Sequence, residues 1–163
     1  RPGLPRQHRR VFVSIGASVG LRPSVVLDTN AVLDWLVFAD PCMAAWAGLI
    51  EAGQLRWLGC SAMREELART LGYAALANRR PDPDHVLARF DRWVVMCSAP
   101  PRVGQPALWC SDPDDQVFID LAMAHKTMWL VSHDRALLRL ARRCRVEGLR
   151  IVKPSEPPRL EQG

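Results

Sequence analysis

Short runs of consecutive apolar residues constrain the fold of this chain more than any other feature. Val25–Leu27 and Met128–Val131 are apolar without alternation, and an aspartate follows each run within three residues. A strand that is apolar on both faces is typical of a parallel sheet covered by helices on both sides. Segments with apolar residues at helical spacing lie between such runs. The alternation predicts an α/β fold, a three-layer sandwich with a mainly parallel central sheet flanked by helices.

The same pattern places the individual elements. Gly53 is expected to end the second helix, and Ser61 is expected to cap the third. Residues 98–106 are rich in proline and are expected to form a loop. Strands are expected at residues 25–27, 55–59, 93–96, 128–131 and 149–152. Helices are expected at residues 30–37, 41–50, from 61, at 83–93, at 115–126 and, as one amphipathic helix, after Asp134.

The chain divides into three parts. Residues 1–23 are rich in Arg, Pro, Gly and Ser, which predicts a basic, flexible N-terminal tail. Residues 24–154 carry all of the expected strands and helices, and their number suits one hydrophobic core. Residues 155–163 are expected to be a C-terminal tail.

Arginine and cysteine usage bear on partners and compartment. The net charge is +5, and all but two of the 22 basic residues are Arg, which suits bidentate phosphate binding, although a basic surface alone leaves nucleic acid an open question. The five cysteines are scattered without a CxxC pair, which argues against a disulfide framework and against a zinc site. Reduced thiols in a cytoplasmic protein are expected. No apolar run of about 18 residues occurs, so we expect no contact with a membrane.

Carboxylates follow both apolar runs and gather a third time before a predicted helix. Asp28 and Asp134 follow predicted strands, where a parallel sheet places reactive groups, although each also suits a helix N-cap. Asp112, Asp114 and Asp115 exceed what a helix N-terminus needs. Close carboxylates raise one another's pKa unless a cation intervenes. These acids favour a divalent-cation site, with Asp115 preferred in the third group because it lies at the base of the apolar face.

Other polar residues have simpler interpretations. Asp34 and Asp120 are expected to be solvated. Only one of the adjacent Glu65 and Glu66 can face a shared site, because neighbouring helical residues point about 100° apart. His133 is either a loop residue, which we favour, or a group that positions phosphate or acts as an acid.

Taken in order, these motifs resemble the PIN-domain family of metal-dependent ribonucleases, in the branch of toxin components of toxin–antitoxin pairs. The resemblance spans about residues 24–154. The chain departs from the family at His133, where glycine is common. The matching segments are Val26–Asn30, Glu66–Leu71, Asp112–Ala122, Leu130–Leu138 and Ile151–Pro154.

The resemblance implies an endoribonuclease that uses Mg²⁺ or Mn²⁺ to hydrolyse RNA phosphodiester bonds. Asn30 and Ser132 match supporting polar positions of the family. The resemblance also implies an RNA substrate, a small antitoxin protein that holds the enzyme inactive and, in many members, a homodimer. The four acids at the family's catalytic and metal-binding positions are Asp28, Glu66, Asp115 and Asp134.

Two other functions stay open. A PIN-fold module that binds RNA or protein without catalysis would fit the departure at His133. A phosphohydrolase with an aspartyl nucleophile would need Asp-x-Asp after the first strand, but the third position is Asn30 and no later lysine motif is evident. If the chain is a ribonuclease, arginines after Asp134 either hold the RNA backbone or form a solvated helix face. These arginines are Arg135, Arg139, Arg142 and Arg143.

Overall fold

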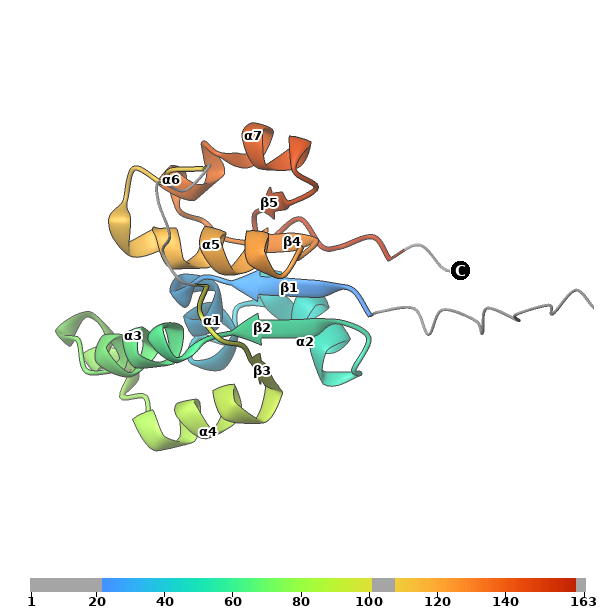
Figure 1. Ribbon diagram of the computed structural model, residues 1–163. Helices are drawn as coiled ribbons and strands as arrows, with labels where there is room; N and C mark the ends of the chain where they lie inside the picture. Colours follow the sequence, from blue (N-terminus) through green and yellow to red (C-terminus); the bar gives the residue numbers. More distant parts are fainter. Residues whose placement is uncertain (1–21, 101–107, 161–163) are drawn as a thin grey trace, which may run out of the picture.

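Five parallel strands form one central sheet in the order β3-β2-β1-β4-β5 (Figure 1). The computed structural model describes residues 22–100 and 108–160. Every neighbouring pair of strands is parallel, which confirms the predicted α/β architecture. The predicted N-terminal tail up to residue 21 and residues 101–107 of the predicted loop lie outside the described residues. The strands are β1 (Ser24–Leu27), β2 (Arg56–Gly59), β3 (Val94–Met96), β4 (Trp129–Val131) and β5 (Arg150–Val152).

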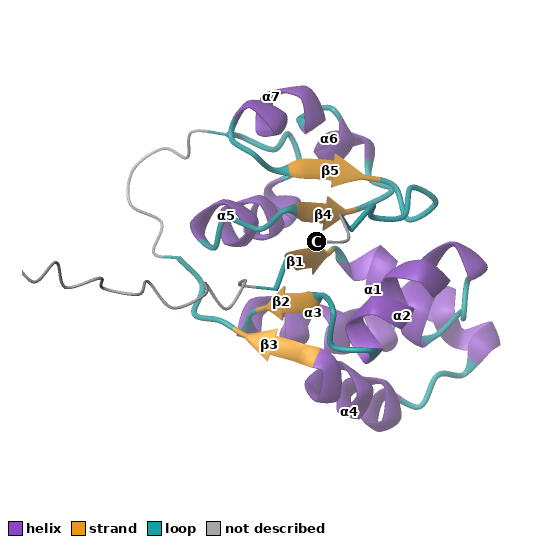
Figure 2. Cartoon of the chain, turned by 90° about the vertical axis from the view of Figure 1, so that its right-hand side faces the viewer, coloured by secondary structure: helices purple, strands orange, loops and turns teal. Residues whose placement is uncertain are grey.

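Helices cover both faces of the sheet (Figure 2). The first face packs against α1 (Thr29–Leu36), α2 (Ala44–Glu51) and α4 (Pro83–Trp93), and the second against α5 (Gln116–Ala124), α6 (Arg135–Leu138) and α7 (Ala141–Val146). Helix α3 (Ser61–Leu71) lies beside α4. Three short 3₁₀ helices span Pro41–Met43, Ala74–Arg79 and Pro113–Asp115.

Strand β1 explains why an unbroken apolar run was needed. Its side chains alternate between the faces, so that Val25 and Leu27 join the hydrophobic cluster under α1 and α2, whereas Val26 joins the cluster under α5. All four residues of β1 are buried. Only its first residue, Ser24, is polar, and a polar side chain in place of Val25, Val26 or Leu27 would be buried among apolar side chains.

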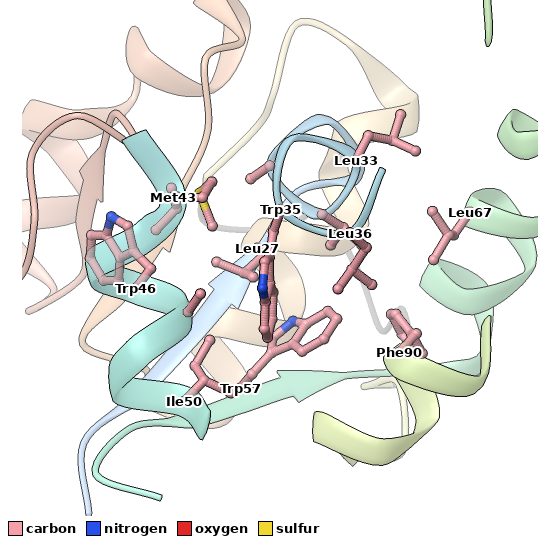
Figure 3. Close-up of a cluster of buried hydrophobic side chains, with 14 of the residues drawn as sticks. Leu27, Leu33, Trp35, Leu36, Met43, Trp46, Ile50, Trp57, Leu67 and Phe90 are labelled. Carbon is pink, nitrogen blue, oxygen red and sulfur yellow. The ribbon is translucent and has the colours of Figure 1, made fainter. Parts of the chain in front are cut away.

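Tryptophan rings fill much of the first cluster (Figure 3). The ring centroids of Trp35 and Trp57 lie 5.5 Å apart, and the Trp57 and Phe90 centroids lie 4.8 Å apart. Trp46 packs edge-on against Trp129 and donates its indole N–H to the carbonyl oxygen of Pro154, at 3.0 Å. This last contact fixes the chain just after β5 against α2.

Several predicted boundaries were wrong. Ser61 does not cap α3, because the N-cap position is Cys60 and no side chain caps the helix there. The helix predicted at 115–126 begins at Gln116, and its first turn is instead the 3₁₀ helix that ends at Asp115. The single helix predicted after Asp134 is two helices, α6 and α7. A tight turn separates them, in which Leu140 N–H donates to the carbonyl of Leu137 at 2.9 Å.

Across the described residues, no single helix is long and apolar enough to cross a membrane, although Thr29–Leu36 and Pro41–Glu51, bent by 105°, pass that test as a pair.

Candidate active site

The candidate site lies where the adjacent strands β1 and β4 end. The N–H of Asp28 donates to the carbonyl of Val131, the last residue of β4, at 3.1 Å. This bond brings Asp28 against the loop of residues 132–134 that follows β4. The two strand-end aspartates expected from the sequence are therefore brought to the same edge of the sheet.

Asp28 is a buried carboxylate, only 3% exposed. One of its oxygens accepts the N–H of Ala31 at 2.8 Å, so that it caps α1, and the other accepts the hydroxyl of Ser132. Burial raises the pKa of Asp28 to about 6, although both hydrogen bonds favour the ionised form. Each carboxylate oxygen accepts only one bond here and retains a further lone pair. The N-cap interpretation is thus confirmed, and it leaves the carboxylate able to bind a cation.

Ser132 links the two strand-end aspartates. Its hydroxyl is fully buried, donates to Asp28 and accepts the N–H of Asp134 at 2.8 Å. Asp134 in turn caps α6, because one carboxylate oxygen accepts the N–H of Ala136 at 2.6 Å and that of Leu137 at 3.4 Å. The capping bonds use one oxygen of Asp134 and fix the orientation of its carboxylate.

Asp115 completes a group of three neighbouring carboxylates. Burial raises its pKa to about 7, and the charges of Asp134, Asp112 and Asp28 raise it further in the same direction. Its Oδ2 atom is buried and has no hydrogen-bond partner. A buried, unpartnered carboxylate oxygen facing two other acids is costly unless a cation is bound.

Glu66 lies on α3 and interacts with Asp112 and Asp114, which precede Asp115 in the chain. Burial raises its pKa, a hydrogen bond with Thr29 opposes that shift, and the charge of Asp114 adds to it. Thr29 is the residue after Asp28. The hydrogen bond between Glu66 and Thr29 therefore holds the Glu66 side chain against the segment that carries Asp28. Glu65, one residue earlier, is exposed. Of the two adjacent glutamates, Glu66 is therefore the one that lies near the acids.

The remaining predicted site residues are dispersed. Asn30 is exposed in the first turn of α1, unlike the buried Ser132. Arg135, Arg139, Arg142 and Arg143 are all exposed. The break between α6 and α7 separates the first two arginines from the last two. Arg142 lines an open hollow of about 970 Å³ together with Arg145 and Arg150, and this hollow runs along β5 to residues 156–159.

Two aspartates were wrongly expected to be solvated. Asp120 is half-buried, and its carboxylate accepts a hydrogen bond at 2.8 Å from Gln116, one turn earlier on the same helix face. The side chain of Asp34 is 19% exposed, and its Oδ2 lies 3.1 Å from Nε2 of His133.

Sequence reasoning also missed a buried polar side chain, that of Gln116. Its amide accepts the N–H of Cys110 at 2.8 Å and donates to the carbonyl of Leu108 at 2.9 Å. These bonds hold residues 108–110 against α5, next to Asp115. A polar residue inside an apolar helix stripe was the available signal.

The comparisons with known proteins agree with this architecture. A chain of the VapBC2 complex from Rickettsia felis, solved bound to a DNA fragment from its promoter, is similar to this chain with a TM-score of 0.54. The match has 14% identity and covers 80% of this chain and 98% of that chain, which shows a common fold. No curated protein matches. The family model described as PIN domain matches residues 24–136, and the chain therefore belongs to the PIN-domain family.

Proposed function

We propose that this protein is a metal-dependent endoribonuclease that hydrolyses RNA phosphodiester bonds, and that it is the toxin of a toxin–antitoxin pair. PIN domains are typically nucleases that use divalent cations. The observation that carries the proposal is the group of Asp28, Asp115 and Asp134, in which Oδ2 of Asp115 is buried and the charges of the two other aspartates raise the pKa of Asp115.

The donor set fits Mg²⁺ or Mn²⁺. All three side chains offer hard carboxylate oxygens, the ligands that these cations prefer. Mutual repulsion among the acids, which contributes to the raised pKa of Asp115, is the repulsion that a divalent cation relieves. Asp28, Asp115 and Asp134 would hold the ion, and Glu66, which interacts with Asp112 and Asp114, would serve as a further ligand or act on the attacking water.

The side chains around the ion would have separate tasks. A bound divalent cation lowers the pKa of a coordinated water and neutralises charge that develops on the phosphate. Ser132 ties the carboxylate of Asp28 to the backbone N–H of Asp134 through two hydrogen bonds. Glu66, oriented by Thr29, would hold the attacking water or accept its proton. No nucleophilic side chain is required.

The substrate contacts proposed here are phosphate contacts. Arg135 is the first residue of α6, the helix that Asp134 caps, and Arg139 is its C-cap residue, so RNA that reaches the acids would pass close to them. Arg142 and Arg143 lie on α7, beyond the break after α6, and Arg142 lines the hollow beside β5. Of the four, Arg135 and Arg139 therefore have the stronger support as RNA-binding residues.

The partner and the compartment follow from the same proposal. The similarity to a chain of the VapBC2 complex supports a cognate antitoxin that binds this chain, and a homodimer is the expected assembly. The five cysteines are free thiols, which suits the reducing cytoplasm.

Cleavage of defined RNAs by the purified protein, with Mg²⁺, with Mn²⁺ and with a chelator, tests the proposal. We expect cleavage only with a divalent cation, and Asp28→Asn should reduce it by at least about 100-fold because a charged ligand is lost. Asp84→Asn is the matched control, since Asp84 is an exposed aspartate in the first turn of α4. Cleavage that persists in the chelator, or that Asp28→Asn leaves unchanged, would refute the proposed function.

A further inference from the structure

A second group of potential metal ligands lies beside the acids and shares no residue with them. Donor atoms of Asp34, Cys42 and His133 all lie within 4.8 Å of one another. They come from α1, from the 3₁₀ helix Pro41–Met43 and from the loop after β4. Asp34 and Cys42 are half-buried, and His133 is exposed, so an ion can enter from solvent.

The turn after α1 brings Cys42 back to Asp34. The carbonyl of Asp34 accepts the N–H of Asp40 at 2.8 Å, and Ala39 adopts a left-handed conformation with φ of 49°. The carboxylate of Asp40 then accepts the N–H of Cys42 at 2.9 Å. Met43, the next residue, is 1% exposed and anchors the turn in the core. The backbone therefore holds Asp34, Asp40 and Cys42 together before any ion binds.

We propose that Asp34, Cys42 and His133 form a binding site for Zn²⁺ or a similar divalent transition-metal ion, distinct from the carboxylate site. Thiolate and imidazole are ligands that Zn²⁺ selects and that Mg²⁺ avoids. Zinc bonds of about 2.0–2.3 Å place tetrahedral ligands roughly 3.2–3.8 Å apart. The 3.1 Å between Asp34 Oδ2 and His133 Nε2 is already close to that spacing.

The electrostatic surroundings favour a cation at this position. Burial, a hydrogen bond to Asp40 and the charges of Asp40 and Asp34 raise the pKa of the Cys42 thiol to about 11. The same negative groups attract a divalent ion, which would displace the thiol proton on binding. Asp40, which accepts the thiol hydrogen bond, or a water would supply a fourth ligand.

The sequence had argued against a zinc site, because no two cysteines are suitably spaced. The folded chain supplies three different ligand types instead, including a pair separated by 99 residues. Since His133 precedes Asp134, an ion here would tie α1 to the loop that presents an acid of the neighbouring site. The ion is thus expected to stabilise the fold whether or not the protein cleaves RNA.

Titration of the metal-free protein with Co²⁺, a spectroscopic substitute for Zn²⁺, tests the site. We expect a thiolate-to-cobalt charge-transfer band that saturates at a single equivalent and is displaced by Zn²⁺. Cys42→Ser should abolish the band, and His133→Ala should weaken Co²⁺ binding by more than about 10-fold. His133 is exposed, so His133→Ala keeps the test valid if Cys42→Ser does not fold.

Two control variants separate this site from the others. Cys97→Ser removes another partly exposed thiol and should leave the band intact. Asp115→Asn removes a proposed Mg²⁺ ligand and should also leave it intact, so that failure of the ribonuclease proposal does not affect this result. Absence of the band, or a band that survives Cys42→Ser, would overturn the proposal and leave His133 and Asp34 as an ion pair only.

Discussion

Ser132, His133 and Asp134 are consecutive, but their side chains serve different groups. Ser132 and Asp134 lie with the carboxylates near Asp28, whereas His133 lies with Asp34 and Cys42. Ser132 is fully buried and joins Asp28 to Asp134, whereas the His133 side chain is 48% exposed and contacts Asp34. The first site presents only carboxylate oxygens and the second presents oxygen, sulfur and nitrogen. The contrast shows how one loop would serve the two proposed sites, whose ligand types suit different metal ions, because successive side chains of an extended segment point in opposite directions.

The largest expected difference between the two sites is in RNA cleavage. Asp115→Asn should reduce Mg²⁺-dependent cleavage by at least about 100-fold, whereas Asp34→Asn should change it by less than about 3-fold, because only Asp115 belongs to the proposed hard-cation site. Initial rates on one RNA at saturating Mg²⁺ measure both. Equal losses would show that the two groups act as one site.

The acids of the first site are also expected to make the metal-free protein less stable as the pH rises. The folded-state pKa values of Asp28 and Asp115, about 6 and about 7, exceed the ordinary value of 3.8. Between about pH 4 and pH 7 the unfolded chain therefore releases protons that the folded chain retains, and the free energy of unfolding falls. Denaturant unfolding in chelator across that pH range should show the fall in the free energy of unfolding. The fall should be smaller in Asp115→Asn, which lacks one of the two carboxylates.

Addition of Mg²⁺ should reverse that loss. At about 100 times its dissociation constant, a bound ion raises the free energy of unfolding by about 2.7 kcal/mol. The gain should grow from pH 5 to pH 8, because the ion binds the ionised carboxylates. A metal-free protein whose stability rises through this range, or a Mg²⁺ effect that shrinks with pH, would contradict the arrangement of acids described here.

A smaller difference is expected between substitutions at adjacent loop positions. Ser132→Ala removes a buried hydroxyl with two partners and should cost about 1–3 kcal/mol, since Asp28 and the N–H of Asp134 each lose a bond. His133→Ala removes an exposed contact and should cost about 0.5 kcal/mol or less in metal-free protein. Thermal unfolding of both variants in chelator compares them. A larger cost at position 133 would mean that His133 supports the fold directly.

The sequence pointed to the residues of the first proposed site more readily than to those of the second, and the reason is physical. Asp28 directly follows one buried strand and Asp134 comes three residues after another, and parallel strands end at a common edge, so their proximity follows from the hydrophobic pattern. The approach of His133 to Asp34 depends on β1 and β4 being neighbours, and the approach of Cys42 to Asp34 depends on the turn through Ala39, neither of which a local pattern reveals. Glu66 was singled out by family resemblance, because one glutamate on a helix carries little information by itself.

The helix boundaries near the site were harder to predict for a related reason. The turn before α5 is a 3₁₀ helix in which Asp112 caps its own segment by accepting the N–H of Asp114 at 3.0 Å. Local hydrogen bonds of this kind compete with the α-helical pattern and shift its start by a residue. Asp115 therefore sits at the junction of two helical segments rather than within one.

The smallest expected effect is that of Cys42→Ser on the response to Mg²⁺. Mg²⁺ dehydrates reluctantly and binds carboxylates rather than thiolate or imidazole. The Mg²⁺-induced rise in unfolding temperature should therefore be the same in Cys42→Ser as in the parent protein, while the rise induced by Zn²⁺ should be lost. A Mg²⁺ response that did depend on Cys42 would contradict this expectation. It would mean that Mg²⁺ also binds at Asp34, which is a carboxylate, and that the turn from Asp34 to Cys42 positions Asp34 for that ion. Thermal unfolding with each ion in turn, on the same preparation, distinguishes the two cases.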